Sequence, residues 1–457
     1  LLDALITSIA GPTIVRDLGG GETLIQWLAA GYTIAMASGL LIGGRLGDIF
    51  GRRRMFLIGM SGFTLMSLGC ALSQSPEMLI TFRVLQGLIG AVMLPQGLGM
   101  IKEMFSEEES AKAFGAFGPI MGLSAVGGPI LAGFLVDGNF FGWEWRSIFA
   151  INIPIGILAI IAGIRYLPAS KPNRSLHIEF TSAAIASGSM FLLIYPLIQG
   201  REKGWPTWTF AMILAGLAGF LLLTYVERTR DRAGKVTLIT PSLFTRRSFT
   251  MGLLTGMTMF GALIGSSLVF TLFVQVGLGY SPLKAGLAGV AQAVFMIVGF
   301  IGSESLINSL GGRKVIQIGQ LIVAAGFGVF VLALQWAGND IGIWGMTPGL
   351  ALLGLGMGLS FAPFFDLVLA GVEEHEAGSA SGVLTAVQQL GGAFGIAVLG
   401  TIYFHVVESS DATSRVGVFR DATTTSMLIG ISLVAATIAF SALLPARARE
   451  EVVAVTA

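Results

Sequence analysis

The chain has 457 residues, of which 54% are hydrophobic and only 12% are charged. Soluble domains carry about 25% charged residues, so this composition excludes an ordinary water-soluble protein and predicts one that is embedded in a bilayer. The net charge of +1 carries no information about partners, because the charges are segregated along the chain. The single cysteine, Cys70, allows neither a disulfide nor a cysteine-based metal site, and the three scattered histidines show no ligand spacing.

Apolar runs that are long enough to cross a bilayer recur about fourteen times along the chain. A transmembrane helix needs about 20 apolar residues, and runs of this length fit helices rather than the strands of a closed barrel. The expected spans are 1–15, 24–42, 55–72, 78–100, 112–136, 147–167, 178–199, 207–226, 249–275, 284–306, 314–336, 344–370, 378–404 and 424–445. The first run is short for a bilayer, so we expect its helix to begin before Leu1.

The basic residues divide unequally between the two sides of these spans. If the N-terminus is cytoplasmic, 19 of the 27 Lys and Arg residues lie in cytoplasmic loops or the C-terminal tail, and 7 lie on the opposite side. Cytoplasmic loops carry an excess of Lys and Arg. The sequence therefore predicts an all-α polytopic membrane protein with both termini in the cytoplasm.

The segment between the second and third spans, GGRLGDIFGRRR at 43–54, is densely charged. The pattern predicts a cytoplasmic turn in which Asp48 pairs with the basic cluster or lies at the start of a neighbouring helix, where a carboxylate is stabilised. We interpret this turn as a latch that holds the cytoplasmic ends together in one conformational state. The alternative is that its arginines only anchor the loop at anionic lipid.

Two charged side chains lie within apolar spans, where a charge is costly and usually functional. Burial favours the neutral form of a carboxyl group, so Asp3 in the first span could exchange a proton with water on each side. Arg83 in the fourth span needs carboxylates or carbonyls as partners, and we interpret it as tuning a proton-carrying acid. The alternatives are a packing role for Asp3 and a helix-end anchor for Arg83.

The fifth span contains several small residues at helical spacing. Gly122, Gly128 and Gly133 make a flat face that allows close contact with another helix, and Pro129 favours a kink. We interpret this helix as a seal against leak while two halves of the protein rock. The alternative is helix packing by small residues with no gating role.

Further polar side chains in the spans are candidates for substrate contact. Glu304 in the tenth span and Asp366 in the twelfth could receive a cationic substrate or a second proton, although pairing with a nearby cation is the alternative. The thirteenth span has no acid, which favours neutral or monocationic substrates. The candidates for an adaptable apolar cavity are Trp27, Tyr32, Gln86, Gln96, Phe361, Asp366 and Gln388.

The segment LINSLGGRK at 306–314 repeats the charged segment in weakened form. With Gly51 and Arg52 aligned on Gly312 and Arg313, Asp48 corresponds to Ser309. Internal repeats are typical of secondary transporters. The repeat predicts an ancient duplication whose boundary lies within 227–247.

These motifs together resemble the major facilitator superfamily, specifically its fourteen-span drug:proton antiporter branch. GRLGDIFGRRR resembles the family's loop motif, with Gly44, Asp48, Gly51, Arg52 and Arg53 in the characteristic places. LITFRVLQGLIGA resembles the motif that carries an intramembrane arginine, GLSAVGGPILAGF the antiporter motif, and LLDALITSIAGPTIV the first-span motif centred on Asp3. The family's usual paired glycine is Ala132-Gly133 here. Three segments, 145–156, 279–286 and 377–400, also look like that branch.

The resemblance implies a major facilitator fold of two six-helix bundles with two extra central helices. The N-terminal bundle would cover 1–167, the two additional helices and a cytoplasmic loop 168–248, and the C-terminal bundle and tail 249–457. It further implies a proton-coupled antiporter in the cell inner membrane that exports lipophilic or monocationic drug-like compounds by alternating access. We expect protons, small lipophilic substrates and membrane lipid as partners, a monomer, no cofactor and no nucleic acid.

Other functions fit the sequence less well. A narrow exporter of an endogenous metabolite, antibiotic, amino acid or lipid is the alternative within transport. ATP-driven pumping is unsupported because no GxxxxGK[ST] phosphate loop is present. A membrane enzyme would need a nucleophile–base pair or a metal cluster, and a receptor would need a signalling domain, neither of which is visible.

Overall fold

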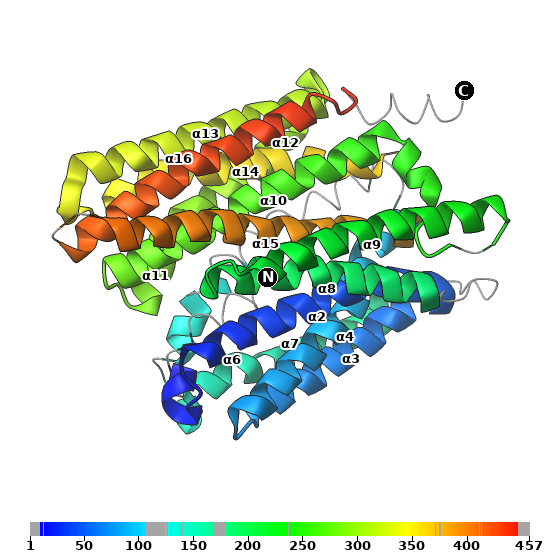
Figure 1. Ribbon diagram of the computed structural model, residues 1–457, viewed down its shortest axis with the longest axis horizontal. Helices are drawn as coiled ribbons and strands as arrows, with labels where there is room; N and C mark the ends of the chain where they lie inside the picture. Colours follow the sequence, from blue (N-terminus) through cyan, green and yellow to red (C-terminus); the bar gives the residue numbers. More distant parts are fainter. Residues whose placement is uncertain are drawn as a thin grey trace.

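The computed structural model describes residues 10–11, 13–105, 109, 124, 127–128, 130–136, 138, 140–168, 180–235, 237–370, 372–373, 376–410, 412 and 414–446. All regular structure in these residues is helical (Figure 1), and twelve of the described helices are long and apolar enough to cross a membrane. The expected spans 1–15 and 112–136 lie mostly outside the described residues, with helical residues at 13–18 and 130–136 near their ends. The total of fourteen spans therefore stays a prediction.

The first group of helices comes from the N-terminal part of the chain. Its long members pack together, with α2 against α4 and α3 against both α4 and α7 (Figure 1). The elements are α2 (Gly21–Phe50), α3 (Arg52–Ala71), α4 (Pro76–Met104), the short 3₁₀ turns η1 (Phe140–Gly142) and η2 (Glu144–Arg146), α6 (Ser147–Ala150) and α7 (Asn152–Tyr166).

The second group comes from the C-terminal part of the chain and has α14 packed between α12 and α13. α10 packs against α15 and α16 in the same group (Figure 1). The elements are η3 (Pro241–Thr245), α10 (Arg247–Leu272), the π-helical turn η4 (Phe273–Gly277), α11 (Pro282–Ala288), α12 (Val290–Leu310), α13 (Gly312–Ala337), η5 (Gly338–Asp340), α14 (Ile343–Leu369), α15 (Ala377–Ser409) and α16 (Arg415–Ser441).

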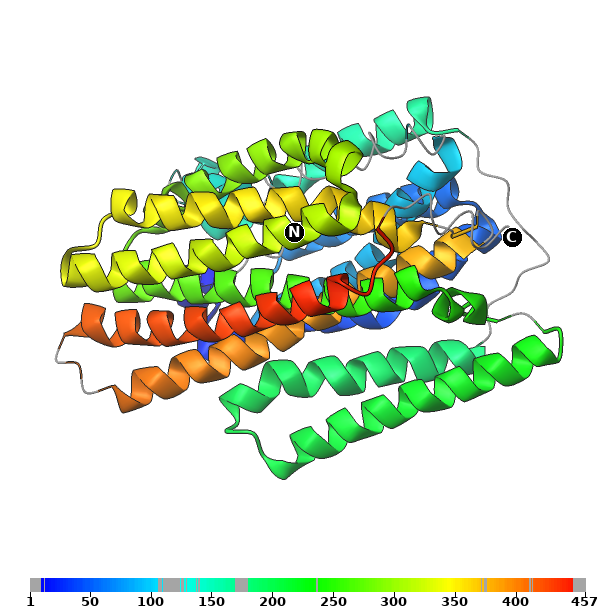
Figure 2. The same cartoon turned by 90° about the horizontal axis from the view of Figure 1, so that it is seen from above.

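Two further helices, α8 (Phe180–Glu202) and α9 (Thr207–Arg232), form a hairpin along one side of the molecule, drawn in green in Figure 2. α8 contacts α2 of the first group and α15 of the second, whereas α9 packs mainly against α8. Only 17% of the most apolar stretch of α9 is buried inside the protein. The outer helix of the hairpin therefore exposes most of its apolar surface to the bilayer.

Small residues set the distance between α2 and α4. A Cβ atom added at Gly43 would lie 2.0 Å from the carbonyl oxygen of Ala91, and one added at Gly39 would lie 2.8 Å from the Cβ of Ala91. Close backbone approach through small residues is the usual way in which membrane helices associate, because lipid offers no hydrophobic drive between them. The same face continues to Gly47, which packs on Gln96 of α4.

The charged segment 43–54 differs from the expected turn. α2 continues through Asp48 to Phe50, and α3 begins at Arg52, so only Gly51 interrupts the two helices. Gly51 has φ of 90°, a conformation that residues with a Cβ rarely adopt. The expectation of a loop was wrong because charged residues at a membrane surface are compatible with a helix.

The structure also corrects the register of the internal repeat. Gly311 ends α12 with φ of 84°, as Gly51 ends α2. Arg53 donates to the carbonyl of Ile164, near the end of α7, and Arg313 donates to the carbonyl of Leu444, just beyond α16. These matches align Gly51 with Gly311, so the counterpart of Asp48 is Asn308 and not Ser309.

We expect Gly43→Ala to destabilise the protein, because the added methyl group has no room beside the Ala91 carbonyl. Overpacking of this kind costs about 1–3 kcal/mol, which should lower the thermal midpoint of detergent-solubilised protein by several degrees in a size-exclusion assay. Gly97→Ala is the matched control on α4, since a Cβ there would meet no atom within 4 Å. Equal midpoints for the two variants would contradict the packing argument.

Candidate functional site

The Asp48 carboxylate lies at the end of the molecule where α2 ends and α15 begins, which we call the Asp48 end. Its Oδ1 accepts a hydrogen bond of 2.8 Å from Arg52, and its Oδ2 lies 3.8 Å from Arg45. The Asp48, Arg45 and Arg52 side chains are each less than 10% exposed. Burial strengthens these charge interactions, because less water screens them.

The same carboxylate also contacts the second group of helices. A Cβ added at Gly378 would lie 2.2 Å from both carboxylate oxygens of Asp48. Gly378 is the second residue of α15, and the N-terminus of a helix carries a partial positive charge that attracts an anion. Asp48 therefore contacts both groups of helices.

Gly44 allows the backbones to approach at this junction. A Cβ at Gly44 would lie 2.5 Å from the Gly378 carbonyl oxygen. The junction thus needs glycine on both sides, one on α2 and one on α15. This requirement explains why the charged motif contains a glycine four residues before its acid.

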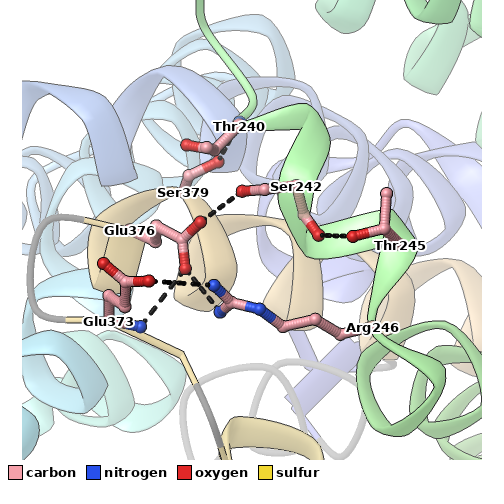
Figure 3. Close-up of polar contacts among 7 residues, drawn as sticks. All are labelled: Thr240, Ser242, Thr245, Arg246, Glu373, Glu376 and Ser379. Atoms are coloured by element: carbon pink, nitrogen blue, oxygen red, sulfur yellow. Dashed lines mark hydrogen bonds and ion pairs between the residues drawn. The ribbon is translucent and has the colours of Figure 1, made fainter. Parts of the chain in front are cut away.

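A second polar cluster surrounds the start of α15 (Figure 3). Arg246 Nη1 lies 2.5 Å from Glu376 Oε2, and Arg246 Nη2 lies 3.4 Å from Glu373 Oε1. The Ser242 hydroxyl donates a hydrogen bond to Glu376. Burial alone raises the pKa of Glu376, but hydrogen bonds from Ser242 and the Glu373 N–H and the Arg246 charge outweigh it, so the pKa is below its usual value. Glu376 is therefore ionised at neutral pH and holds η3 against α15.

Arg83 is fully buried in a polar network of the first group of helices. It donates to Gln86 Oε1 at 2.7 Å and to the Leu28 carbonyl at 3.3 Å, and its guanidinium carbon lies 4.3 Å from the centre of the Tyr32 ring. Gln86 in turn donates to the Ser67 hydroxyl at 2.7 Å. Cation–π and carbonyl contacts of this kind stabilise an arginine in an apolar interior.

Two cavity candidates make packing contacts within the helix groups. Gln96 donates to the carbonyls of Gly43 and Val92, both at 2.7 Å, and thereby braces α4 against α2. Phe361 is 2% exposed and packs on the Phe260 ring with centroids 5.6 Å apart.

The remaining candidates lie in three settings. Trp27 is half-buried, and its ring centroid is 6.4 Å from that of Tyr195 on α8. Gln388 and Asp366 are half-buried on α15 and α14, and Asp366 is three residues from the end of α14. Glu304 is exposed, six residues from the end of α12.

The two groups of helices also touch at the opposite end, which we call the Asp17 end. A Cβ at Gly133 would lie 2.9 Å from the backbone nitrogen of Leu283 in α11. Gly133 and Gly128 are both buried, which fits the small-residue face expected of this span. The candidates Asp3, Gly122 and Pro129 lie outside the described residues.

Asp17 secures the Asp17 end of the first group. Its Oδ2 accepts hydrogen bonds from Trp145 at 2.9 Å and from Arg146 at 2.6 Å. These two bonds, followed by the Arg146 charge, lower the pKa of Asp17 below its usual value. The segment before α2 is thereby tied to the segment before α7.

The family model of the Major Facilitator Superfamily matches residues 1–396. This chain belongs to the Major Facilitator Superfamily. Its fold is similar to that of the human organic anion transporter MFSD10 (TETRAN), with a TM-score of 0.64, 15% sequence identity, and coverage of 95% of this chain and 96% of the other. The protein is accordingly a multi-pass membrane transporter rather than an enzyme.

Two relatives within this superfamily are similar in sequence. The chain is 45% identical to a protein named "Probable actinorhodin transporter" from Streptomyces coelicolor, over 91% of this chain and 72% of that relative. It is 32% identical to "Multidrug resistance protein Stp" from Mycobacterium tuberculosis, over 88% of this chain and 73% of that relative.

Sequence reasoning missed several residues of this superfamily member. Glu376, Arg246 and Ser242 form one cluster, although more than 100 residues of sequence separate Glu376 from its two partners, Arg246 and Ser242. The sequence WRSIFAINIPIG at 145–156 was a family signal, but it gave no hint that Trp145 binds Asp17. Among the described residues, no group of three His, Cys, Asp or Glu side chains could hold a metal ion.

We expect Asp17→Asn to remove a stabilising contribution that depends on pH. Because the folded pKa of Asp17 lies below the ordinary value of about 3.9, the contribution is complete above that value and is lost as the pH falls through the folded pKa. The difference in thermal midpoint between wild type and variant should be constant from about pH 7 to pH 5 and should shrink below about pH 4. A difference that persists unchanged to about pH 3 would contradict this assignment.

Proposed function

We propose that the protein is a proton-coupled antiporter that exports lipophilic or monocationic drug-like compounds by alternating access. The observation that carries this proposal is the Asp48 junction, where one buried carboxylate of α2 links Arg52 of α3 to the start of α15. Relatives named for transport of actinorhodin and for multidrug resistance support export as the direction. The junction supports a mechanism in which two groups of helices separate and rejoin.

Alternating access requires that contacts at one end break while those at the other end hold. In this structure the groups touch at Gly44 and Gly378 on one side and at Gly133 and Leu283 on the other. Substrate and protons can shift the balance between states only if they bind the states with different affinity. Charge contacts at Asp48 and small-residue contacts at Gly133 give the two ends different chemistry.

Proton coupling rests on the buried network around Arg83. A guanidinium held by Gln86, Leu28 and Tyr32 is fixed in place, so its positive charge can favour the ionised form of a nearby acid in one state only. Asp3 is our candidate for that acid, with Glu304 and Asp366 as the next. Arg83 then acts by holding charge at a fixed position rather than by carrying the proton.

A narrow exporter of a single endogenous compound is the second candidate function. It is favoured by one observation, since the relative with 45% identity is named for one compound, actinorhodin, whereas the relative with 32% identity is named for multidrug resistance. Both functions use the same gate, so they differ only in the residues that contact substrate.

The proposal includes the finer features expected from the sequence. It assumes fourteen spans in a monomer in the plasma membrane, with both termini and the Asp48 end in the cytoplasm and no cofactor. The chain would then divide into bundles at 1–167 and 249–457, with the additional helices at 168–248. The contacts of α8 with both α2 and α15 support an additional pair that lies alongside both bundles and bridges them.

Purified protein in liposomes with an imposed pH gradient tests the function directly. We expect the gradient to drive accumulation of a lipophilic cationic dye, and dissipation of the gradient with a protonophore to abolish it. Asp3→Asn should abolish the proton dependence. Exchange that is independent of the gradient would exclude proton coupling, and transport of actinorhodin but not of the dye would favour the narrow exporter.

We expect Asp48→Asn to impair transport without affecting insertion. Asparagine keeps the shape and one acceptor oxygen but loses the charge that binds Arg52 and the start of α15. A hydrogen bond to a charged group is worth about 1.5–3 kcal/mol, so export should fall about tenfold or more. Asn308→Ala at the counterpart position is the control, and equal transport by the two variants would contradict the latch.

A further inference from the structure

The first turn of α15 is held from two sides. On one side, the Asp48 carboxylate lies against Gly378, and a Cβ added at Gly382, one turn further on, would lie 3.3 Å from the Leu40 carbonyl oxygen of α2. On the other side, the cluster around Glu376 fastens the turn to the segment before α10 (Figure 3). The contact that closes the Asp48 end is therefore made on a turn whose position is set by a second group of residues.

The residues on this second side come from the segment 237–246, which we call the strap. It follows the additional helix pair in the chain and leads into α10. Thr240 of the strap donates its N–H to the Ser379 hydroxyl of α15 at 3.1 Å. At its other end, the Ile239 N–H donates to the carboxylate of Glu227, near the end of α9, at 3.2 Å. The strap thus connects α9 to the start of α15.

Helical geometry keeps the two sides of the turn apart. Glu376 and Ser379 are three residues apart, so they lie on neighbouring positions of one face, and both bind the strap. Gly378 is two residues from Glu376 and projects about 200° around the helix axis from it, toward Asp48. The strap and Asp48 therefore hold the same turn without competing for the same positions.

Arg246, the last residue of the strap, is the charged part of this attachment. Its guanidinium lies 2.5 Å from Glu376 and 3.4 Å from Glu373. The side chain of Glu373 is 55% exposed, whereas that of Glu376 is only 2% exposed. In the described part of the chain, no other basic side chain lies within ion-pair range of Glu376. Loss of Arg246 would leave Glu376 as a buried charge without a counterion, which is strongly destabilising.

The two buried acids at this turn have separate arginine partners. Asp48 pairs with Arg52 at 2.8 Å and lies 3.8 Å from Arg45, whereas Glu376 pairs with Arg246. A buried charge is costly unless it is paired, so the arginines beside Asp48 do not substitute for Arg246. Without Arg246, an uncompensated carboxylate would remain on the turn that Asp48 contacts, and like charges near each other disfavour the ionised form. The turn would then lose its position and become a poorer partner for Asp48.

The Arg246–Glu376 pair lies within the second group of helices. Arg246 directly precedes α10, and Glu376 directly precedes α15. These two helices pack closely, because a Cβ added at Gly265 of α10 would lie 2.6 Å from the Gly395 carbonyl oxygen of α15. The pair can therefore stay formed when the two groups separate and only the contact with Asp48 breaks. A turn that keeps its position in the open state is ready to receive Asp48 when the groups return.

We propose that Arg246 is a positioning residue of the gate, which acts through Glu376 to hold the first turn of α15 in place for Asp48. This inference rests on the alternating-access proposal above but not on its proton coupling or substrate. The segment that follows the additional helix pair thereby contributes to closure of the Asp48 end. Without the Arg246 charge, the turn shifts and the Asp48 end is open for a larger share of the time.

The distance between two spin labels in the full-length chain measures how often the Asp48 end is open. Met104 and Leu310 are exposed and are the last residues of α4 and α12, which belong to different groups of helices. With labels on Met104→Cys and Leu310→Cys in a Cys70→Ala background, double electron–electron resonance separates a shorter, closed distance from a longer, open one. We expect Arg246→Gln to raise the open-to-closed ratio about fivefold or more, the low end of coupling between sites.

Arg247→Gln is the matched control, because Arg247 is the next residue along the chain and is exposed. It should leave the ratio unchanged. A parental ratio in Arg246→Gln would overturn the inference. Glu376→Gln removes the other charge of the same pair and should raise the ratio to a similar extent. It decides the question if Arg246→Gln does not fold, and a parental ratio in Glu376→Gln would overturn the inference equally.

A double variant separates positioning for Asp48 from general support of the fold. Asp48→Asn alone should raise the ratio, and Arg246→Gln should raise it little further in that background, because residues that act on one contact are not additive. An undiminished effect there would mean that Arg246 stabilises the closed form by another route, and would overturn the inference. The measurement needs neither substrate nor a gradient, so a transport failure in liposomes would refute the proposed function separately.

Discussion

The burial of one carboxylate, Asp48, constrains much of the surrounding structure. Because Asp48 must reach Arg52 and the start of α15 at once, α2 has to continue as a helix past the position where its charges begin. The backbones at the junction must also approach closely, which requires glycine at Gly44 and Gly378. A helix without these glycines would hold the acid too far from α15 for the two groups of helices to share its charge. The glycine spacing of α2 therefore follows from the acid that it positions.

The two halves of the repeat share their geometry but not their charges. Gly51 and Gly311 end their helices with similar positive φ, and Arg53 and Arg313 bind carbonyls at the ends of α7 and α16. Asp48 and Arg52, by contrast, correspond to Asn308 and Gly312, so the acid and its partner are missing together. An unpaired Asp or Arg at a buried junction would be costly, which explains why neither occurs alone. The second group of helices presents the N-terminus of α15 to Asp48, and not a charged residue of the repeated segment.

The sequence was sufficient to predict the helical class, most spans and the contact between Asp48 and a neighbouring helix. It could not predict where α2 ends, because the residues before Gly51 are compatible with a helix and with a turn, and only the φ of Gly51 distinguishes them. The one-residue error in the repeat came from the same source, since two consecutive glycines, Gly311 and Gly312, could each match Gly51. The polarity of Gln96 within a span indicated function, but no local pattern could predict that it donates to the Gly43 carbonyl and so links α4 to α2. Partners such as Glu376 and Arg246 are distant in sequence, and no local pattern identifies such pairs.

The ends of the molecule are held by different kinds of interaction, and this difference has consequences for how the halves can move. At the Asp17 end, Gly133 packs on the backbone of Leu283, a contact that depends on shape and loses strength over a fraction of an ångström. At the Asp48 end the contacts are ionic and buried, so their strength rises as water leaves and falls as water enters. Opening of the Asp48 end therefore weakens the remaining charge contacts as soon as the first water molecules reach Asp48. Both ends therefore change between closed and open over a narrow range of movement, the Asp48 end because entering water weakens its charge contacts and the Asp17 end because its packing contact is lost.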